Sequence, residues 1–131
     1  MNLLDAAKAG DLQTLQRLIR TGADLENTDE NGATALILAA SNGHTPCLRA
    51  LIAANADVDA SDNEDVTALI AAARNGSVDC ARYLLRADAY VEATDNNGCT
   101  ALVAAARKGC AQCLQLLINA GADIEAREEE R

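Results

Sequence analysis

The chain has 131 residues, a formal net charge of -9, and only two aromatic side chains, Tyr83 and Tyr90. A single domain with so few aromatics must fill its core with Ala, Leu, Ile, Val and Cys, which favours closely packed helices over a β-sandwich. The negative charge argues against nucleic acid and anionic membranes as partners, and no segment reaches the roughly 20 apolar residues of a membrane span. Five cysteines without a signal peptide predict free thiols in a cytoplasmic protein, with the nucleus as the alternative compartment.

A unit of 33 residues recurs along the chain. Full copies occupy 29–61, 62–94 and 95–127, while 1–28 matches the end of the same unit and 128–131 form an acidic tail. The triplet Thr-Ala-Leu marks the register, because it begins at Thr34, Thr67 and Thr100. A fixed period of this length indicates a stack of small units, each of which buries its apolar side against its neighbours.

Each full unit predicts two short helices followed by a hairpin. The threonines cap the first helix, which a glycine ends at Gly10, Gly43, Gly76 or Gly109. The second helix has Pro46 in its first turn in one unit. It ends at residue types that tolerate positive φ, namely Gly22, Asn55, Asp88 and Gly121. An Asp-led turn, such as Asp95 to Gly98, then forms a hairpin to the next unit.

These residues resemble the ankyrin-repeat family, whose unit is a β-turn followed by two helices and whose signature contains D-x-x-G-x-T-P-L-H-x-A-A-x-x-G-H. Here T-P-L-H stands as T-A-L-I at 34–37 and 67–70 and as T-A-L-V at 100–103, and Asp65 replaces the turn glycine of the third unit. The resemblance spans almost the whole chain. It implies one all-α ankyrin-repeat solenoid over 1–131, in which stacked helix-turn-helix units are joined by short β-hairpin loops and 1–28 form a partial N-terminal capping repeat.

No set of residues predicts a catalytic centre, a metal site or a cofactor. His44 is the only histidine. The equivalent positions of the other units, which together form one column of the aligned repeats, hold other polar side chains, so we expect a polar role at a helix start. The C-x-x-C of Cys110 and Cys113 lacks the further ligands of a zinc site. The acidic turns carry alanine where a calcium loop needs glutamate. We therefore expect no enzyme activity.

Two columns of reactive side chains could be taken for functional sites but have simpler explanations. One column of thiols comprises Cys47, Cys80 and Cys113, and one column of carboxylates comprises Glu26, Asp59, Glu92 and Glu125. Stacked helices lie about 10 Å apart, which is beyond the reach of a disulfide or of a paired-carboxylate site. We expect buried cysteines and a solvated acidic edge.

The ankyrin resemblance implies that a partner protein binds the concave surface of hairpins and first helices, through residues that vary between units. Lys8, Arg74 and Arg107 share a column and, with Lys108, make a basic stripe that either contacts partner carboxylates or offsets the chain's own acidic hairpins. Tyr90 replaces an aspartate and is either an exposed hot spot or packs on its own hairpin. The candidate partner-binding residues are Lys8, Glu30, Asn31, Ala33, Ser41, Asn63, Glu64, Val66, Arg74, Tyr90, Asn96, Asn97, Cys99, Arg107 and Lys108.

The two ends of the stack differ in polarity. The first unit has polar residues where later units are apolar, at Asp5, Thr14 and Arg17, so it is predicted to be a cap. The fourth unit shows no such change. We expect a bare outer face there, from Leu102, Ala105, Leu114, Leu117 and Ile118. Either further units follow in a longer parent protein, or this face stacks on another molecule, such as a second copy in a symmetric dimer.

We therefore predict a non-catalytic protein-protein interaction module, whose partner protein the sequence does not identify. The alternative is an engineered or self-assembling scaffold with a structural role, in which the uncapped C-terminal repeat self-associates. A third alternative is redox sensing through Cys99, Cys110 or Cys113, which requires an unusually reactive thiol.

Overall fold

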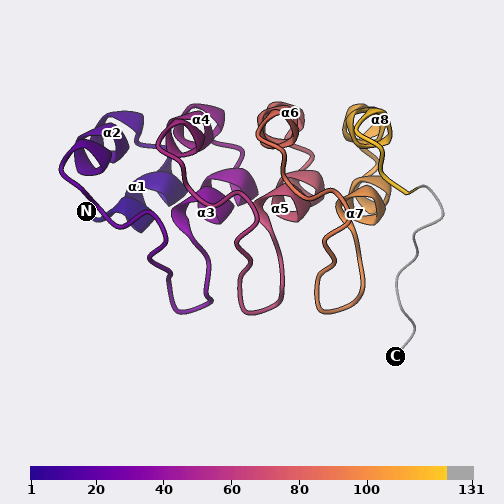
Figure 1. Cartoon of the computed structure of the whole chain (residues 1–131), viewed down its shortest axis with the longest axis horizontal. Coiled ribbons are helices and arrows are strands. Elements are labelled where there is room, and N and C mark those ends of the chain that lie inside the picture. Colours follow the sequence, from indigo (N-terminus) through magenta and orange to yellow (C-terminus); the bar gives the residue numbers. More distant parts are fainter. Residues whose placement is uncertain (124–131) are drawn as a thin grey trace.

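The computed structural model describes residues 1–123, in which eight α-helices alternate between two rows. Figure 1 shows α1, α3, α5 and α7 as an inner row, with α2, α4, α6 and α8 as an outer row above it and the hairpin loops extending below. The helices are α1 (Leu3–Ala9), α2 (Leu12–Arg20), α3 (Ala35–Ser41), α4 (Thr45–Ala53), α5 (Ala68–Asn75), α6 (Val78–Arg86), α7 (Ala101–Lys108) and α8 (Ala111–Asn119). The predicted all-α solenoid of helix-turn-helix units is confirmed.

The helix caps fall where the sequence predicts them. Thr34, Thr67 and Thr100 each accept a hydrogen bond at Oγ1 from the backbone N–H three residues on, at 3.3 Å. The glycines after the inner helices take the left-handed conformation, with φ of 75° at Gly10 and 69° at Gly76. Asn55 and Asp88 do the same after the outer helices, at 69° and 63°. These residues produce the sharp reversals that keep the units short.

His44 stands at the start of α4, as predicted, but its ring does not cap that helix. Its Nε2 instead lies 3.1 Å from the carbonyl oxygen of Lys8 in the preceding unit. The ring also covers Gly10, where an added Cβ would come within 2.6 Å of Nδ1. The histidine is therefore a bridge between the first two units.

Small side chains form the core between the inner helices. Ala39, Ala40, Ala72, Ala73 and Ala105 are fully buried. Alanine at these positions lets neighbouring helices approach closely, which suits a core almost without aromatics. The leucines and cysteines of the outer helices complete this core, and Cys47, Cys80 and Cys113 are buried and free, as predicted.

Hydrogen bonds link each hairpin to the next along the stack. The Asn63 N–H donates to the carbonyl oxygen of Asn31, and the Asn96 N–H donates to that of Glu64, both at 3.0 Å. The hairpins themselves are built from turns. Among residues 1–123 the only isolated β-bridge is an antiparallel pair between Ser61 and Thr67. The β-hairpin loops expected from the resemblance are therefore turns without extended strands.

The column of carboxylates has a structural role that we did not predict. Glu26 accepts a hydrogen bond from the Asp57 N–H at 3.0 Å, and Asp59 accepts one from the Tyr90 N–H at 2.8 Å. Glu92 repeats the contact with the next unit, at 3.0 Å from the Asp123 N–H. The expected solvated edge is thus also a ladder that joins neighbouring units. Glu125 lies outside the described residues.

The two ends of the stack differ as expected in kind but not in every residue. At the first unit, Asp5 and Arg17 are exposed and Thr14 is half-buried. At the fourth, Ala105 and Leu117 are fully buried and Leu102 is 8% exposed, so these three do not belong to a bare outer face. Of the five residues expected on that face, only Leu114, which is half-buried, and Ile118, which is 43% exposed, have accessible side chains.

Candidate protein-binding groove

A hollow of about 310 Å³ opens where the last hairpin meets the inner helices. Arg74 reaches it from α5, Arg107 and Lys108 reach it from the end of α7, and the hairpin contributes Asn97. The complete lining is Arg74, Asp95, Asn97, Cys99, Ala104, Arg107 and Lys108. Three cations therefore surround one carboxylate, in a protein whose overall charge is negative.

An ion pair anchors this hollow. Arg74 Nη2 donates to Asp95 Oδ2 at 2.6 Å, and the other carboxylate oxygen accepts from the backbone of Asn97 at 2.8 Å and of Cys99 at 3.0 Å. The Asp95 side chain is 1% exposed, whereas that of Arg74 is 48% exposed. The pair thus joins the third unit to the fourth while leaving about half of the Arg74 side chain exposed to solvent.

The charge of Asp95 is maintained by its neighbours. Burial is the largest influence on the pKa of Asp95 and raises it. Hydrogen bonds from the Cys99 and Asn97 backbone and from Arg74 together outweigh burial and hold the pKa below its ordinary value. The carboxylate is therefore ionised at neutral pH, and it holds Arg74 in place before any partner protein binds.

A second hollow continues the groove toward the N-terminus. It has a volume of about 270 Å³ and is lined by Ser41, Asp62, Val66, Ala71, Arg74 and Asn75. Arg74 lines both hollows, so they form adjacent parts of one surface along α3, α5 and α7. Ser41 is the residue of the second repeat that is equivalent to Arg74 in the third. Asp62, which is equivalent to Asp95, has no ion pair among the described residues.

The comparison with protein families agrees with this architecture. The model for ankyrin repeats (three copies) matches residues 3–95 and again 57–128. The chain belongs to the ankyrin-repeat family. Ankyrin repeats generally mediate protein-protein interaction, and the family is typically non-enzymatic. A comparison with curated proteins gives no match.

Most of the predicted binding residues are exposed on the ankyrin stack. These are Lys8, Glu30, Asn31, Ser41, Asn63, Glu64, Arg74, Tyr90, Asn96, Asn97, Arg107 and Lys108. Ala33, Val66 and Cys99 are 6%, 4% and 3% exposed, because each follows the tip of a hairpin and closes it by backbone hydrogen bonds to the leading aspartate. Val66 and Cys99 line the two hollows, but all three side chains are buried and offer a partner little surface, contrary to our expectation.

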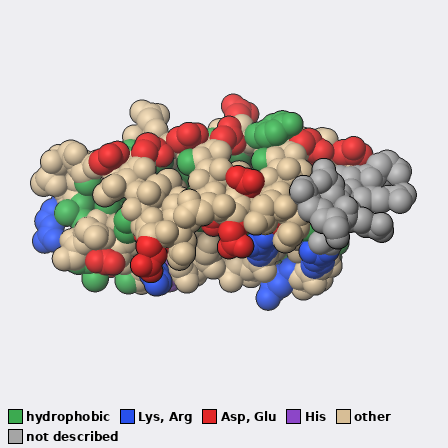
Figure 2. Space-filling view, turned by 90° about the horizontal axis from the view of Figure 1, so that it is seen from below, with side chains coloured by type: hydrophobic (Ala, Val, Ile, Leu, Met, Phe, Trp, Pro, Cys, Tyr) green, Lys and Arg blue, Asp and Glu red, His purple; other side chains and the backbone are tan. Residues whose placement is uncertain are grey.

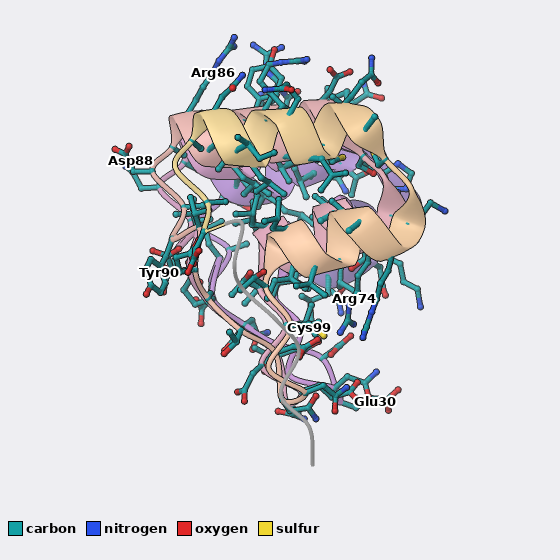
Figure 3. The ribbon with its side chains drawn as sticks, turned by 90° about the vertical axis from the view of Figure 1, so that its right-hand side faces the viewer. Glu30, Arg74, Arg86, Asp88, Tyr90 and Cys99 are labelled. Carbon is teal, nitrogen blue, oxygen red and sulfur yellow. The ribbon has the colours of Figure 1, made fainter. Side chains whose placement is uncertain are left out.

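Tyr90 is not on the same face as the groove. Figure 3 shows Arg74, Cys99 and Glu30 on one side of the ankyrin hairpins and Tyr90 with Asp88 on the other. The Tyr90 side chain is 61% exposed, so it does not pack away on its own hairpin. Figure 2 shows the same division, with Lys and Arg mainly along one long edge and Asp and Glu along the middle and the opposite edge. A partner of the basic groove would not reach Tyr90 from that side.

Sequence reasoning missed Asp95 and Asp62 as groove residues, because both were assigned only to turns. A signal was present, since Asp95 follows Arg74 by 21 residues and Asp62 follows Ser41 by the same interval. Once the repeat period is known, such an offset places one residue of an inner helix beside the hairpin of the next ankyrin repeat.

The remaining thiols and acidic residues form no further site that the structure reveals. The Cys110 Sγ accepts a hydrogen bond from the Cys113 N–H at 3.3 Å. A hydrogen bond with the Cys113 thiol is the largest influence on the pKa of Cys110 and lowers it, whereas burial raises the pKa of Cys113 to about 12. Within residues 1–123 no three His, Cys, Asp or Glu side chains gather as metal ligands, and no helix has the length and hydropathy of a membrane span.

Proposed function

We propose that this ankyrin-repeat chain is a non-catalytic module that binds a partner protein through the groove of hairpins and inner helices. The observation that supports this most strongly is the hollow around the Arg74–Asp95 pair, where three cations meet on a rigid frame. Preformed polar groups of this kind bind with little loss of side-chain entropy. We further propose an intracellular location, in keeping with the five free cysteines.

The charge of the hollow favours carboxylates on the partner. Arg74 is already paired with Asp95, so its half-exposed side chain adds positive potential but is held in place. Lys108 is exposed at the mouth of the hollow, beside Arg107. We therefore expect the partner to contact the last turn of α7 first, and electrostatic attraction there to raise the rate of association.

The test is affinity capture with two matched double variants. Arg107→Gln/Lys108→Gln removes two charges from the groove, and Arg17→Gln/Arg20→Gln removes two charges from α2, away from it. We expect partners to be lost from the first variant and retained by the second, as measured by quantitative mass spectrometry and then by calorimetry with the purified partner. Equal capture by both variants would contradict the proposal. Arg74 is left intact because its removal would leave a buried carboxylate unpaired.

The exposed end of the last repeat favours a second candidate function, a scaffold that assembles with itself. Ile118 is 43% exposed and Val103 is half-buried, whereas Ile70 at the column of Val103 is 1% exposed in the third repeat. Light scattering at two protein concentrations separates the candidates. A mass that rises with concentration in the parent chain, and stays constant in Ile118→Glu, would favour self-assembly.

A further inference from the structure

The outer helices carry a charge opposite to that of the whole chain. Within their bounds they contain five arginines, Arg17, Arg20, Arg49, Arg82 and Arg86, and one acidic residue, Asp79. The segments 21–34, 54–67 and 87–100, which include the hairpins, contain twelve acidic residues and no Lys or Arg. The outer row and the hairpins lie on opposite sides of the inner row (Figure 1). Of the twelve acidic residues, Asp88 follows Arg86 by only two residues and lies beside the outer row in Figure 3. Charges farther away than about 8 Å are largely screened at physiological salt, so a ligand that enters between α4 and α6 meets mainly the arginines of the outer row.

Two of these arginines stack on one tyrosine. The guanidinium carbon of Arg49, on α4, lies 4.5 Å from the centre of the Tyr83 ring, and that of Arg86 lies 5.5 Å from it. Tyr83 and Arg86 belong to α6 of the next repeat, so the cluster crosses a repeat boundary. Stacking holds each guanidinium plane while leaving its N–H groups available for hydrogen bonds at the edge.

Neither arginine of this cluster has a carboxylate partner in the part of the chain that the structure describes. The ion pairs found there are Arg74 with Asp95 and Arg82 with Asp79, at 2.6 Å and 2.5 Å. Arg82 therefore neutralises the one acidic residue within the outer helices. In a chain with a net charge of -9, two guanidiniums that contact the same ring and have no carboxylate partner are an unusual concentration of positive charge.

A hollow of about 250 Å³ lies at this cluster, between α4 and α6. Its lining is Arg49, Ile52, Ala53, Tyr83, Arg86 and Ala87. Apart from the two guanidiniums and the phenol, these side chains are apolar. The hollow thus combines an apolar floor with two cationic edges. It lies on the outer row, far from the groove of the proposed function (Figure 3, where Arg86 is labelled at the top).

We propose that this hollow binds an acidic segment of a partner protein. The Arg49 and Arg86 guanidiniums donate hydrogen bonds to two carboxylates of that segment, and an aliphatic side chain between the carboxylates packs on Ile52, Ala53 and Tyr83. A short acidic peptide suits the site better than a nucleic acid, because the hollow has room for a side chain, and a long polyanion would also meet the acidic hairpins.

The experiment uses the full chain and a blocked fluorescent peptide in which glutamate alternates with leucine. A peptide with glutamine in place of glutamate and a single-stranded oligonucleotide of equal length serve as competing probes. The variant is Arg49→Gln/Arg86→Gln, and the matched control is Arg17→Gln/Arg20→Gln, which removes the same charge from α2. Circular dichroism checks that every variant remains folded, and Tyr83→Leu tests the stack while keeping an apolar floor.

We expect the glutamate peptide to bind the parent chain and the α2 control equally. Since each arginine would supply a hydrogen bond between charged groups, the loss of both should weaken binding by at least roughly tenfold. Tyr83→Leu should weaken it by less, and the side-chain Nε resonances of Arg49 and Arg86 should shift on titration. Equal binding by Arg49→Gln/Arg86→Gln, an equal loss in the α2 control, or tighter binding of the oligonucleotide would each overturn the proposal. These outcomes leave the groove proposal untouched, because Arg107 and Lys108 are unchanged.

Discussion

The two hollows of the groove occupy the same place in successive repeats, yet only one of them contains an ion pair. Between the third and fourth repeats Arg74 meets Asp95, which is almost fully buried. Between the second and third repeats Ser41 stands at the column of Arg74, and Asp62 remains half-buried. Both aspartates accept the same two backbone hydrogen bonds of their hairpin. The difference shows that the repeat frame needs the aspartate, whereas the cation is an addition that varies between repeats.

The largest effect is expected from removing the two aspartates one at a time. Asp95→Ala leaves Arg74 unpaired and removes the acceptor of the buried Cys99 N–H and the part-buried Asn97 N–H, so it should lower the free energy of unfolding by about 3 kcal/mol. Asp62→Ala loses only the hairpin bonds and should cost about 1–2 kcal/mol. Urea denaturation measures both. Equal losses would show that the ion pair adds nothing to the hairpin bonds.

The second prediction concerns pH and the same pair. Because the pKa of Asp95 is lowered in the folded chain, its charge stabilises the fold above the pKa of the unfolded carboxyl, which is about 3.9. That stabilisation is lost as the pH falls through the lowered value. The free energy difference between the parent chain and Asp95→Asn should therefore be constant near neutral pH and shrink in acid. A difference that stays unchanged down to the lowest pH at which the chain folds would contradict this assignment.

The third prediction compares the turns of the same two hairpins. Asp65 has φ of 63° at the position where Gly98 has 79°. A non-glycine residue in the left-handed region costs on the order of 1 kcal/mol. We expect Asp65→Gly to raise the free energy of unfolding by about that amount, and the matched Gly98→Asp to lower it. Thermal denaturation with both variants measures the pair of changes.

The repeat pattern predicts the parts of this fold that depend on local chemistry. The threonine caps, the left-handed ends at Asn55 and Asp88, and the buried cysteines all follow from the period and from residue type. The contacts between repeats do not, since they depend on how far each side chain reaches across the stack. That is why the Glu26 ladder, the Arg74–Asp95 pair and the Arg49–Tyr83 stack appear only in three dimensions.

The site residues illustrate the same limit. Column comparison selects residues that vary, and Val66 and Cys99 vary between repeats as much as Arg74 does. Variation alone does not distinguish a side chain that closes a hairpin from one that faces a partner. Tyr90 was grouped with the basic residues for the same reason, although it lies on the opposite face of the hairpins.

The smallest effect is expected from building the missing pair. Ser41→Arg places a guanidinium 21 residues before Asp62, which is the interval between Arg74 and Asp95, in a hollow of about 270 Å³. The new pair is half-exposed and lies near Arg74, so it should add no more than about 0.5–1 kcal/mol to the free energy of unfolding. Ser41→Lys is the matched control, because Lys8 stands opposite Asp29 in the same way and makes no ion pair with it among the described residues. The planar fork of arginine can hold a carboxylate by two bonds, whereas lysine acts as a point charge, so the gain should belong to arginine alone. An equal gain from lysine would mean that the charge of the column matters and the geometry of the Arg74–Asp95 pair does not.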